Sequence, residues 1–221
     1  MPLPPRLSRR HLGLAAGLVV WPWLAGLGAA AAFAPPDGGV LDLAIVRKGD
    51  VIGDYRSDFA TRPDGSLEVI TRIDAEITLG PVRLYHFRHS STETWRDGKL
   101  VALFSDTDDD GDIHHLQAHQ ANGALAINVD GKTETASAEA VPSSLWTLAM
   151  LDADRPIFDI VDGQQFKAER HCEAAKPPEG PGTACKITGE LERTLHYSPK
   201  GLLDSLSFSA DDGSTVTYRG H

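Results

Sequence analysis

Short runs of alternating apolar and polar residues, separated by turn residues, fill most of the chain. Between Leu67 and Leu79, apolar side chains fall mostly on alternate positions with polar neighbours between them. Successive side chains of a strand point to opposite faces, so this period of two predicts a long strand with one buried and one wet face. The stretch 82–95 repeats the pattern, with Tyr85, Phe87 and Trp95 on one face.

Turn signals separate these runs at near-regular intervals. Asp-Gly and Asn-Gly pairs favour tight hairpins, because those turns need positive φ, which glycine adopts at little steric cost. A strand–acidic turn–strand module spans 95–120 and returns at 201–218. We therefore expect an all-β protein of roughly a dozen strands, a long antiparallel sheet curled into a half-barrel or barrel. A two-sheet sandwich is the alternative.

Two stretches carry more specific expectations. Residues 142–151 break the alternation and predict one short amphipathic helix, covering a mouth or face of the sheet. Ile187, Leu191, Leu195 and Tyr197 are expected to line one face of a single strand.

The N-terminus is typical of an export signal. Arg9 and Arg10 precede an apolar run that ends in a cluster of alanines, and the paired arginines are similar to a twin-arginine signal. Cleavage after Ala32 would leave 33–221 as a single β domain that is periplasmic or secreted. A retained membrane anchor is the alternative, since about 20 apolar residues can span a bilayer.

The charge of the remaining chain disfavours two classes of partner. Residues 1–34 carry three arginines and no carboxylate, so the rest has 18 basic and 31 acidic residues, a net charge of 18 − 31 = −13. This charge repels nucleic acid and anionic membrane surfaces. The alternative is that the charge only keeps an exported protein soluble.

Two cysteines agree with export. Cys172 and Cys185 flank a loop rich in proline and glycine. In an oxidising compartment this arrangement predicts a structural disulfide.

One loop matches half of a calcium-binding motif. Asp106, Asp108 and Asp110 precede Gly111 with the spacing of such a loop, but its twelfth position is the neutral Gln117. No other cofactor is indicated. The alternative is a solvated acidic hairpin turn.

The sequence offers little for catalysis. On a single strand, the histidines from 86 to 119 lie too far apart, or on opposite faces, to share one zinc ion, so a zinc site would need neighbours across strands. The carboxylate pairs Asp74 with Glu76 and Glu93 with Asp97 are expected to be solvated. No nucleophile elbow or phosphate-binding glycine loop is found.

Several motifs together resemble an exported bacterial family of unknown function. They are Ile52-Gly53, Glu93-Thr94-Trp95, Gly98-x-Leu100, Pro142-Ser143-Ser144-Leu145-Trp146 and Tyr218. The long strands are also distantly similar to the half-barrels of periplasmic lipoprotein carriers. That resemblance implies a hydrophobic concave face, and no catalytic residues come with it.

The first functional hypothesis is a non-catalytic periplasmic protein. Its concave face would bind a hydrophobic small molecule or an envelope protein through Tyr85, Phe87, Trp95 and Trp146, unless these aromatics only fill the core. A metal-assisted hydrolase using His and Asp of the sheet, and a calcium-stapled structural module, are the alternatives. We expect no nucleic acid partner and no membrane contact after signal cleavage.

Overall fold

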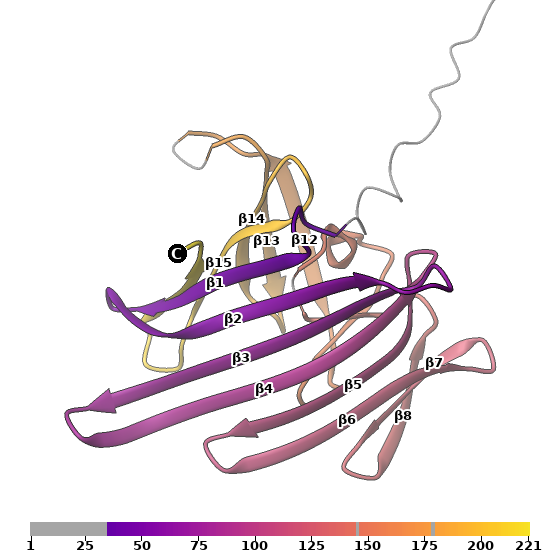
Figure 1. Cartoon of the computed structure of the whole chain (residues 1–221), viewed down its shortest axis with the longest axis horizontal. Coiled ribbons are helices and arrows are strands. Elements are labelled where there is room, and N and C mark those ends of the chain that lie inside the picture. The colour runs from indigo at the N-terminus through magenta and orange to yellow at the C-terminus, as the bar shows by residue number, and fades with distance from the viewer. Residues whose placement is uncertain (1–34, 145, 178–179) are drawn as a thin grey trace, which may run out of the picture.

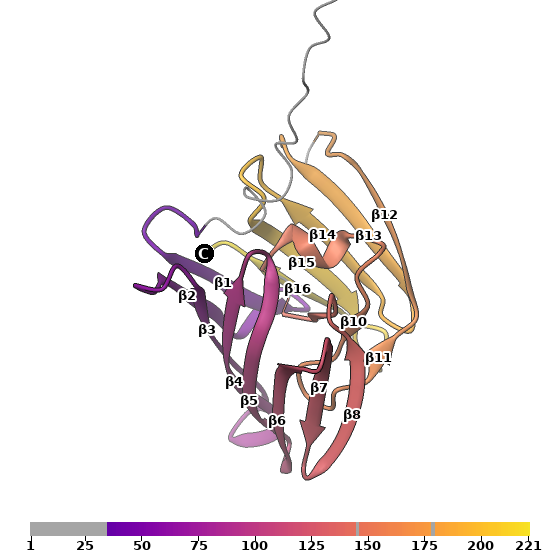
Figure 2. The same ribbon diagram turned by 90° about the vertical axis from the view of Figure 1, so that its right-hand side faces the viewer.

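The computed structural model describes residues 35–144, 146–177 and 180–221. Thirteen strands in this part form one antiparallel sheet that curls into an open half-barrel (Figures 1 and 2). In sheet order they are β12 (Ala168–Ala174), β13 (Thr183–Gly189), β14 (Arg193–Tyr197), β15 (Leu203–Ser209), β16 (Thr215–Arg219), β1 (Val40–Arg47), β2 (Asp50–Thr61), β3 (Leu67–Leu79), β4 (Val82–Arg96), β5 (Lys99–Asp109), β6 (Asp112–Ala121), β7 (Ala124–Val129) and β8 (Lys132–Ser137). The predicted fold class is confirmed. The predicted signal segment, residues 1–32, lies outside the described residues.

Tight turns produce the up-and-down order of β1 to β8. At the β4–β5 turn, Asp97 and Gly98 have φ of 51° and 74°, and at the β5–β6 turn Asp110 and Gly111 have 53° and 102°. Both residues of each turn are left-handed, as the Asp-Gly pairs predicted. Each strand therefore pairs with its sequence neighbour, and the chain needs no crossover between β1 and β8.

Residues 140–144 and 146–166 pack against the concave face and are called the plug segment here. It contains β9 (Val141–Pro142), β10 (Ile157–Phe158) and β11 (Gln165–Phe166), a three-stranded sheet, and the 3-10 turn η2 (Leu148–Leu151). Two side chains of the large sheet hold its backbone: the Tyr55 hydroxyl donates to the Ser144 carbonyl at 2.8 Å, and the Ser105 hydroxyl donates to the Ile160 carbonyl at 2.7 Å.

Two local expectations were wrong. The helix predicted over 142–151 is only the four-residue η2 in the described part, because residues 141–142 pair as a strand with β10. The single strand predicted from Ile187 to Tyr197 is two strands, β13 and β14, which turn back after Gly189 at φ 109°. Leu195 and Ile187 still share the buried face because they lie on neighbouring strands.

The sheet has two unlike ends. At the closed end, near the β2–β3 and β4–β5 turns, the plug segment covers the concave face (Figure 2). At the open end, near the β1–β2, β3–β4 and β5–β6 turns, the β3–β4 hairpin extends past its neighbours, since the pairing of β3 with β2 stops at Ala75 and that of β4 with β5 at Phe87 (Figure 1). Leu79, Val82 and Leu84 on this extension are mostly exposed.

No helix among the described residues is long and apolar enough to cross a membrane.

Candidate functional site

The inner face of β4 runs from the open end to the closed end and changes character on the way. Because successive side chains alternate, every second residue faces the plug segment and the opposite wall. These inward residues are Tyr85, Phe87, His89, Ser91, Glu93 and Trp95. The first two are partly exposed and the last four are buried.

The closed end is tightly packed around two indole rings. Trp95 and Trp146 have 2% and 0% of their surface exposed, and their rings meet edge to face with centroids 5.8 Å apart. Both indole N–H groups donate to Oε2 of Glu93, at 2.6 and 3.1 Å. Burial raises the pKa of Glu93, so this carboxyl favours its neutral form. These aromatics and the carboxyl form a core contact between β4 and the plug segment.

Glu93 corrects the expectation of a solvated carboxylate. It is 0% exposed because it shares the inward face with Tyr85, Phe87 and Trp95. Tyr85, Phe87 and Trp95 are odd-numbered residues of one strand, so every odd-numbered residue of that strand, Glu93 included, lies on the same face. The expectation for Glu93 did not take this alternation into account.

A row of small polar side chains crosses the middle of the inner face. Ser57, Thr71, Ser91 and Ser105 pair directly across β2 to β5, and the hydroxyls of Ser57 and Thr71 are 2.8 Å apart. His89 is the next inward residue of β4 toward the open end, and its Nδ1 lies 2.8 Å from the Thr107 hydroxyl.

Two buried atoms on this face have no hydrogen-bond partner within the described part of the chain. They are Nε2 of His89 and Oγ of Ser91, on successive inward residues of β4. Oε1 of the next inward residue, Glu93, makes no hydrogen bond of normal geometry, but the Ser144 side chain lies close enough to lower the pKa of Glu93. Buried polar atoms in folded proteins are nearly always satisfied, by protein or by bound molecules. The plug segment reaches this row, since the Ile160 carbonyl accepts from Ser105, which pairs with Ser91.

The open end combines partly exposed aromatics with acidic and phenolic groups. The Tyr85 hydroxyl donates to Oδ1 of Asp109 at 2.7 Å. Tyr218, on β16 of the opposite wall, packs against Phe208 with ring centroids 6.3 Å apart. Burial raises the pKa of Tyr218 to about 12, and the Tyr218 phenol contributes to raising the pKa of Tyr85, which burial raises most. Strand pairing from Tyr218 through Ile45, Gly53 and Ala75 to Phe87 places these aromatics at the same level of the inner face.

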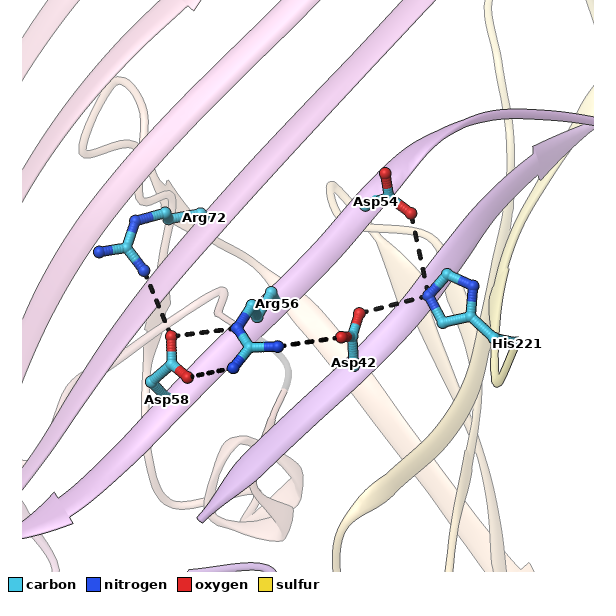
Figure 3. Close-up of polar contacts among 6 residues, drawn as sticks. All are labelled: Asp42, Asp54, Arg56, Asp58, Arg72 and His221. Atoms are coloured by element: carbon cyan, nitrogen blue, oxygen red, sulfur yellow. Dashed lines mark hydrogen bonds and ion pairs between the residues drawn. The ribbon is translucent and has the colours of Figure 1, made fainter. Parts of the chain in front are cut away.

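The outer face of the sheet carries a ladder of ion pairs. Arg56 and Arg72 lie directly opposite each other on β2 and β3, an arrangement that is unfavourable for like charges. Asp58 compensates them, at 2.8 Å from Arg56 and 3.2 Å from Arg72. Asp42 joins Arg56 at 3.1 Å and His221 at 3.3 Å (Figure 3).

Beside this ladder is a hollow of about 520 Å³. It is lined by Asp54, Arg56, Arg72, Ile73, Asp74, Arg88, His89, Ser90, Asp106, Thr107, Asp108 and Ile113. Its three guanidinium groups are already paired, since Arg88 lies 3.4 Å from Asp74 and Asp58 holds the other two. Exposed ion pairs of this kind contribute little to the stability of the fold. Because its three guanidinium groups are paired, the hollow offers no unpaired arginine to an anionic ligand.

The residues of the predicted calcium loop lie in and beside the β5–β6 hairpin. Asp106 is 2.6 Å from His115, and Asp108 is 3.0 Å from His86. Asp108 also accepts the Gly111 N–H at 2.9 Å, a contact typical of an acidic turn. In the residues that the structure describes, no group of three or more His, Cys, Asp or Glu side chains is placed to hold a metal ion.

The predicted disulfide is confirmed. Cys172 on β12 and Cys185 on β13 lie directly opposite each other and are bonded, with Cα atoms 4.2 Å apart. The bond joins the outermost strand to the rest of the sheet.

Comparisons with known proteins agree with the fold and leave the activity open. A family model described as a domain of unknown function (DUF6134) matches residues 44–220. A crystal structure titled as a beta-barrel-like protein of domain of unknown function DUF1849, from Brucella abortus, is similar with a TM-score of 0.55 and 8% identity, over 80% of this chain and 93% of that chain. At this identity the likeness shows the fold alone. No curated protein matches the sequence.

Proposed function

Because the chain belongs to the DUF6134 family, a family of unknown function, we propose an activity from the geometry: a non-catalytic binding protein whose concave face holds a hydrophobic ligand at the open end. The observation that carries this proposal is the gradient along β4. Tyr85 and Phe87 remain partly exposed on the concave face, whereas Trp95 and Trp146 are sealed against the plug segment.

This gradient divides the four aromatics into two roles. When a ligand covers an aromatic side chain that is partly exposed on a concave surface, the burial stabilises the complex by roughly 25 cal/mol for each Å² of apolar surface removed from water. A side chain that the core already covers contributes nothing to ligand binding in this way. We therefore assign ligand contact to Tyr85 and Phe87, and a structural role to Trp95 and Trp146.

Export is part of the proposal. The paired arginines, the apolar run and the alanine cluster of residues 1–32 support a periplasmic or secreted protein, and a disulfide persists in such an oxidising compartment. Replacing both Arg9 and Arg10 by lysine is expected to leave the protein in the cytoplasm, as cell fractionation would show. Normal export of that variant would refute the twin-arginine route.

The binding proposal is tested with a neutral apolar fluorophore, N-phenyl-1-naphthylamine, titrated into the purified mature protein. We expect saturable enhancement of fluorescence. Phe87→Ala should weaken binding about tenfold, which corresponds to about 1.4 kcal/mol of lost contact. Phe104→Ala is the matched control, because Phe104 lies on β5, is 54% exposed and faces the outer side.

Two results would count against the proposal. One is the absence of saturable uptake by the wild-type protein. The other is an equal loss of affinity in Phe87→Ala and Phe104→Ala. Urea denaturation of both variants confirms that each is folded under the binding conditions.

A further inference from the structure

Arg193 occupies an unusual position for an arginine. It is the first residue of β14 and is partly buried, two positions before the buried inward residue Leu195. Its guanidinium carbon lies 4.4 Å from the centre of the Phe208 ring, and Nη1 donates to the Glu192 carbonyl at 2.7 Å. Among the described residues, no ion pair joins Arg193 to a carboxylate.

The Asp159 carboxyl acts on Arg193 without forming an ion pair with it. Asp159 in the plug segment acts electrostatically on Arg193, but its Oδ1 is taken by the N–H groups of Val161 at 2.6 Å and Asp162 at 3.3 Å. Burial raises the pKa of Asp159 and so disfavours its ionised form. Burial also lowers the pKa of Arg193, although a guanidinium remains protonated in proteins. A charge that is partly removed from water without an ion-pair partner is costly, so the site favours an anion.

Arg193 belongs to the open end of the concave face. The Phe208 ring beneath it packs against Tyr218. Tyr218 lies level with Phe87 across the sheet, because strand pairing joins Tyr218 to Ile45, Ile45 to Gly53, Gly53 to Ala75 and Ala75 to Phe87. A molecule lying along the exposed aromatic surface from Phe87 toward the opposite wall therefore ends near the guanidinium.

We propose that the ligand is an anionic amphiphile, with its apolar chain on Tyr85 and Phe87 and its carboxylate or phosphate on Arg193. This inference rests on the proposed binding function and specifies its ligand class. Arginine forms two parallel hydrogen bonds to carboxylate and phosphate oxygens. Phe208 stacks on the opposite face of the group and holds its plane.

The test compares two ligands of equal chain length, dodecanoate and dodecanol, as competitors of the fluorophore below their critical concentrations for aggregation. The wild-type protein should bind dodecanoate about tenfold or more tightly than dodecanol, the range expected for a hydrogen bond to a charged group. Arg193→Met keeps an apolar side chain over Phe208 and should remove this preference while dodecanol binding stays the same. Arg88→Met, on the outer face, is the matched control and should keep the preference. Dodecyl phosphate as a third ligand separates a phosphate group from a carboxylate.

The outcomes separate the two proposals. If neither ligand displaces the fluorophore, or the fluorophore itself does not bind, the binding function fails. If dodecanol binds as tightly as dodecanoate, or if Arg193→Met keeps the preference, the function stands and the role of Arg193 is overturned.

A second measurement uses the unaltered protein, in case Arg193→Met does not fold. Dodecanoate carrying ¹³C in its carboxyl group is titrated by NMR in the complex. A guanidinium next to the carboxylate should lower the carboxyl pKa below that of free dodecanoate. An unchanged or raised pKa would place the carboxyl away from Arg193 and overturn the inference.

Discussion

The buried histidine of the inner face should make the stability of the protein depend on pH. His89 is 3% exposed, and burial lowers its pKa from 6.5 to about 4, while the nearby Asp106 opposes this shift. Below pH 6.5 the unfolded chain binds a proton that the folded protein excludes. The stability that neutral His89 contributes is therefore present above pH 6.5 and is lost as the pH falls toward 4.

The magnitude follows from the two pKa values. The interval between 6.5 and about 4 corresponds to about 3 kcal/mol, at about 1.4 kcal/mol for each pH unit. Roughly 2 kcal/mol of this should be lost between pH 7 and pH 5, where the unfolded histidine becomes protonated and the folded one does not. Glu93 acts in the opposite direction, since burial raises its pKa, but its contribution is the same in variants that retain it.

The assay is urea denaturation at pH 7 and pH 5 of the wild-type protein and His89→Gln. Glutamine does not titrate and keeps a polar side chain beside Thr107. We expect the loss of unfolding free energy between the two pH values to be smaller in the variant by roughly 2 kcal/mol. His119→Gln is the control, because His119 is exposed on β6. An unchanged pH dependence in His89→Gln, or an equal decrease in His119→Gln, would refute the assignment.

Three further predictions concern stability. Glu93→Ala should lower the unfolding free energy measured in urea by roughly 3 kcal/mol or more, because two buried indole N–H groups lose their acceptor. Glu93→Gln keeps a neutral acceptor and should change the unfolding free energy by less than about 1 kcal/mol. Equal effects of the two substitutions would contradict a neutral carboxyl. Replacing Cys172 and Cys185 by serine should cost about 3 kcal/mol, from the thirteen-residue separation that the bond closes, and thermal unfolding with and without reductant should show no difference in that variant only. Gly53→Ala should destabilise the folded protein by roughly 1–3 kcal/mol, because the new Cβ would lie 2.1 Å from a backbone oxygen of β3. Gly220→Ala is the control, since a Cβ there meets nothing within 4 Å. Similar melting temperatures for the two variants would disprove this close approach.

The regular part of the sheet could be predicted from the sequence because its signals are local. The period of two from Leu67 to Leu79 and the Asp-Gly turns set strand direction, face and neighbour without reference to distant residues. Tyr85, Phe87 and Trp95 were correctly placed on one face for the same reason.

The plug segment and the inner site could not be predicted because they depend on contacts far apart in the chain. Residues 142–151 have a helical pattern of apolar residues, yet the Ser143 N–H donates to the Phe158 carbonyl of β10, and the Ser144 carbonyl accepts from Tyr55, 89 residues away. Arg193 carries no local signal at all. Its role follows only from its place opposite β4, which the curl of the sheet decides.

The inner face of β4 contains three polar residues where the fold alone would accept apolar ones. On the neighbouring strands, Leu103 pairs with Glu93 and Ile73 pairs with His89, and both apolar side chains are buried at the same level. An orphaned polar atom of a buried side chain costs roughly 1–3 kcal/mol relative to a satisfied one, so a sequence selected for packing alone would avoid His89 and Ser91 at these positions. Their position is also informative, because they begin where the partly exposed aromatics end and stop where the packed indoles begin. The polar residues therefore mark the boundary between the partly exposed aromatics of the open end and the packed core of the closed end.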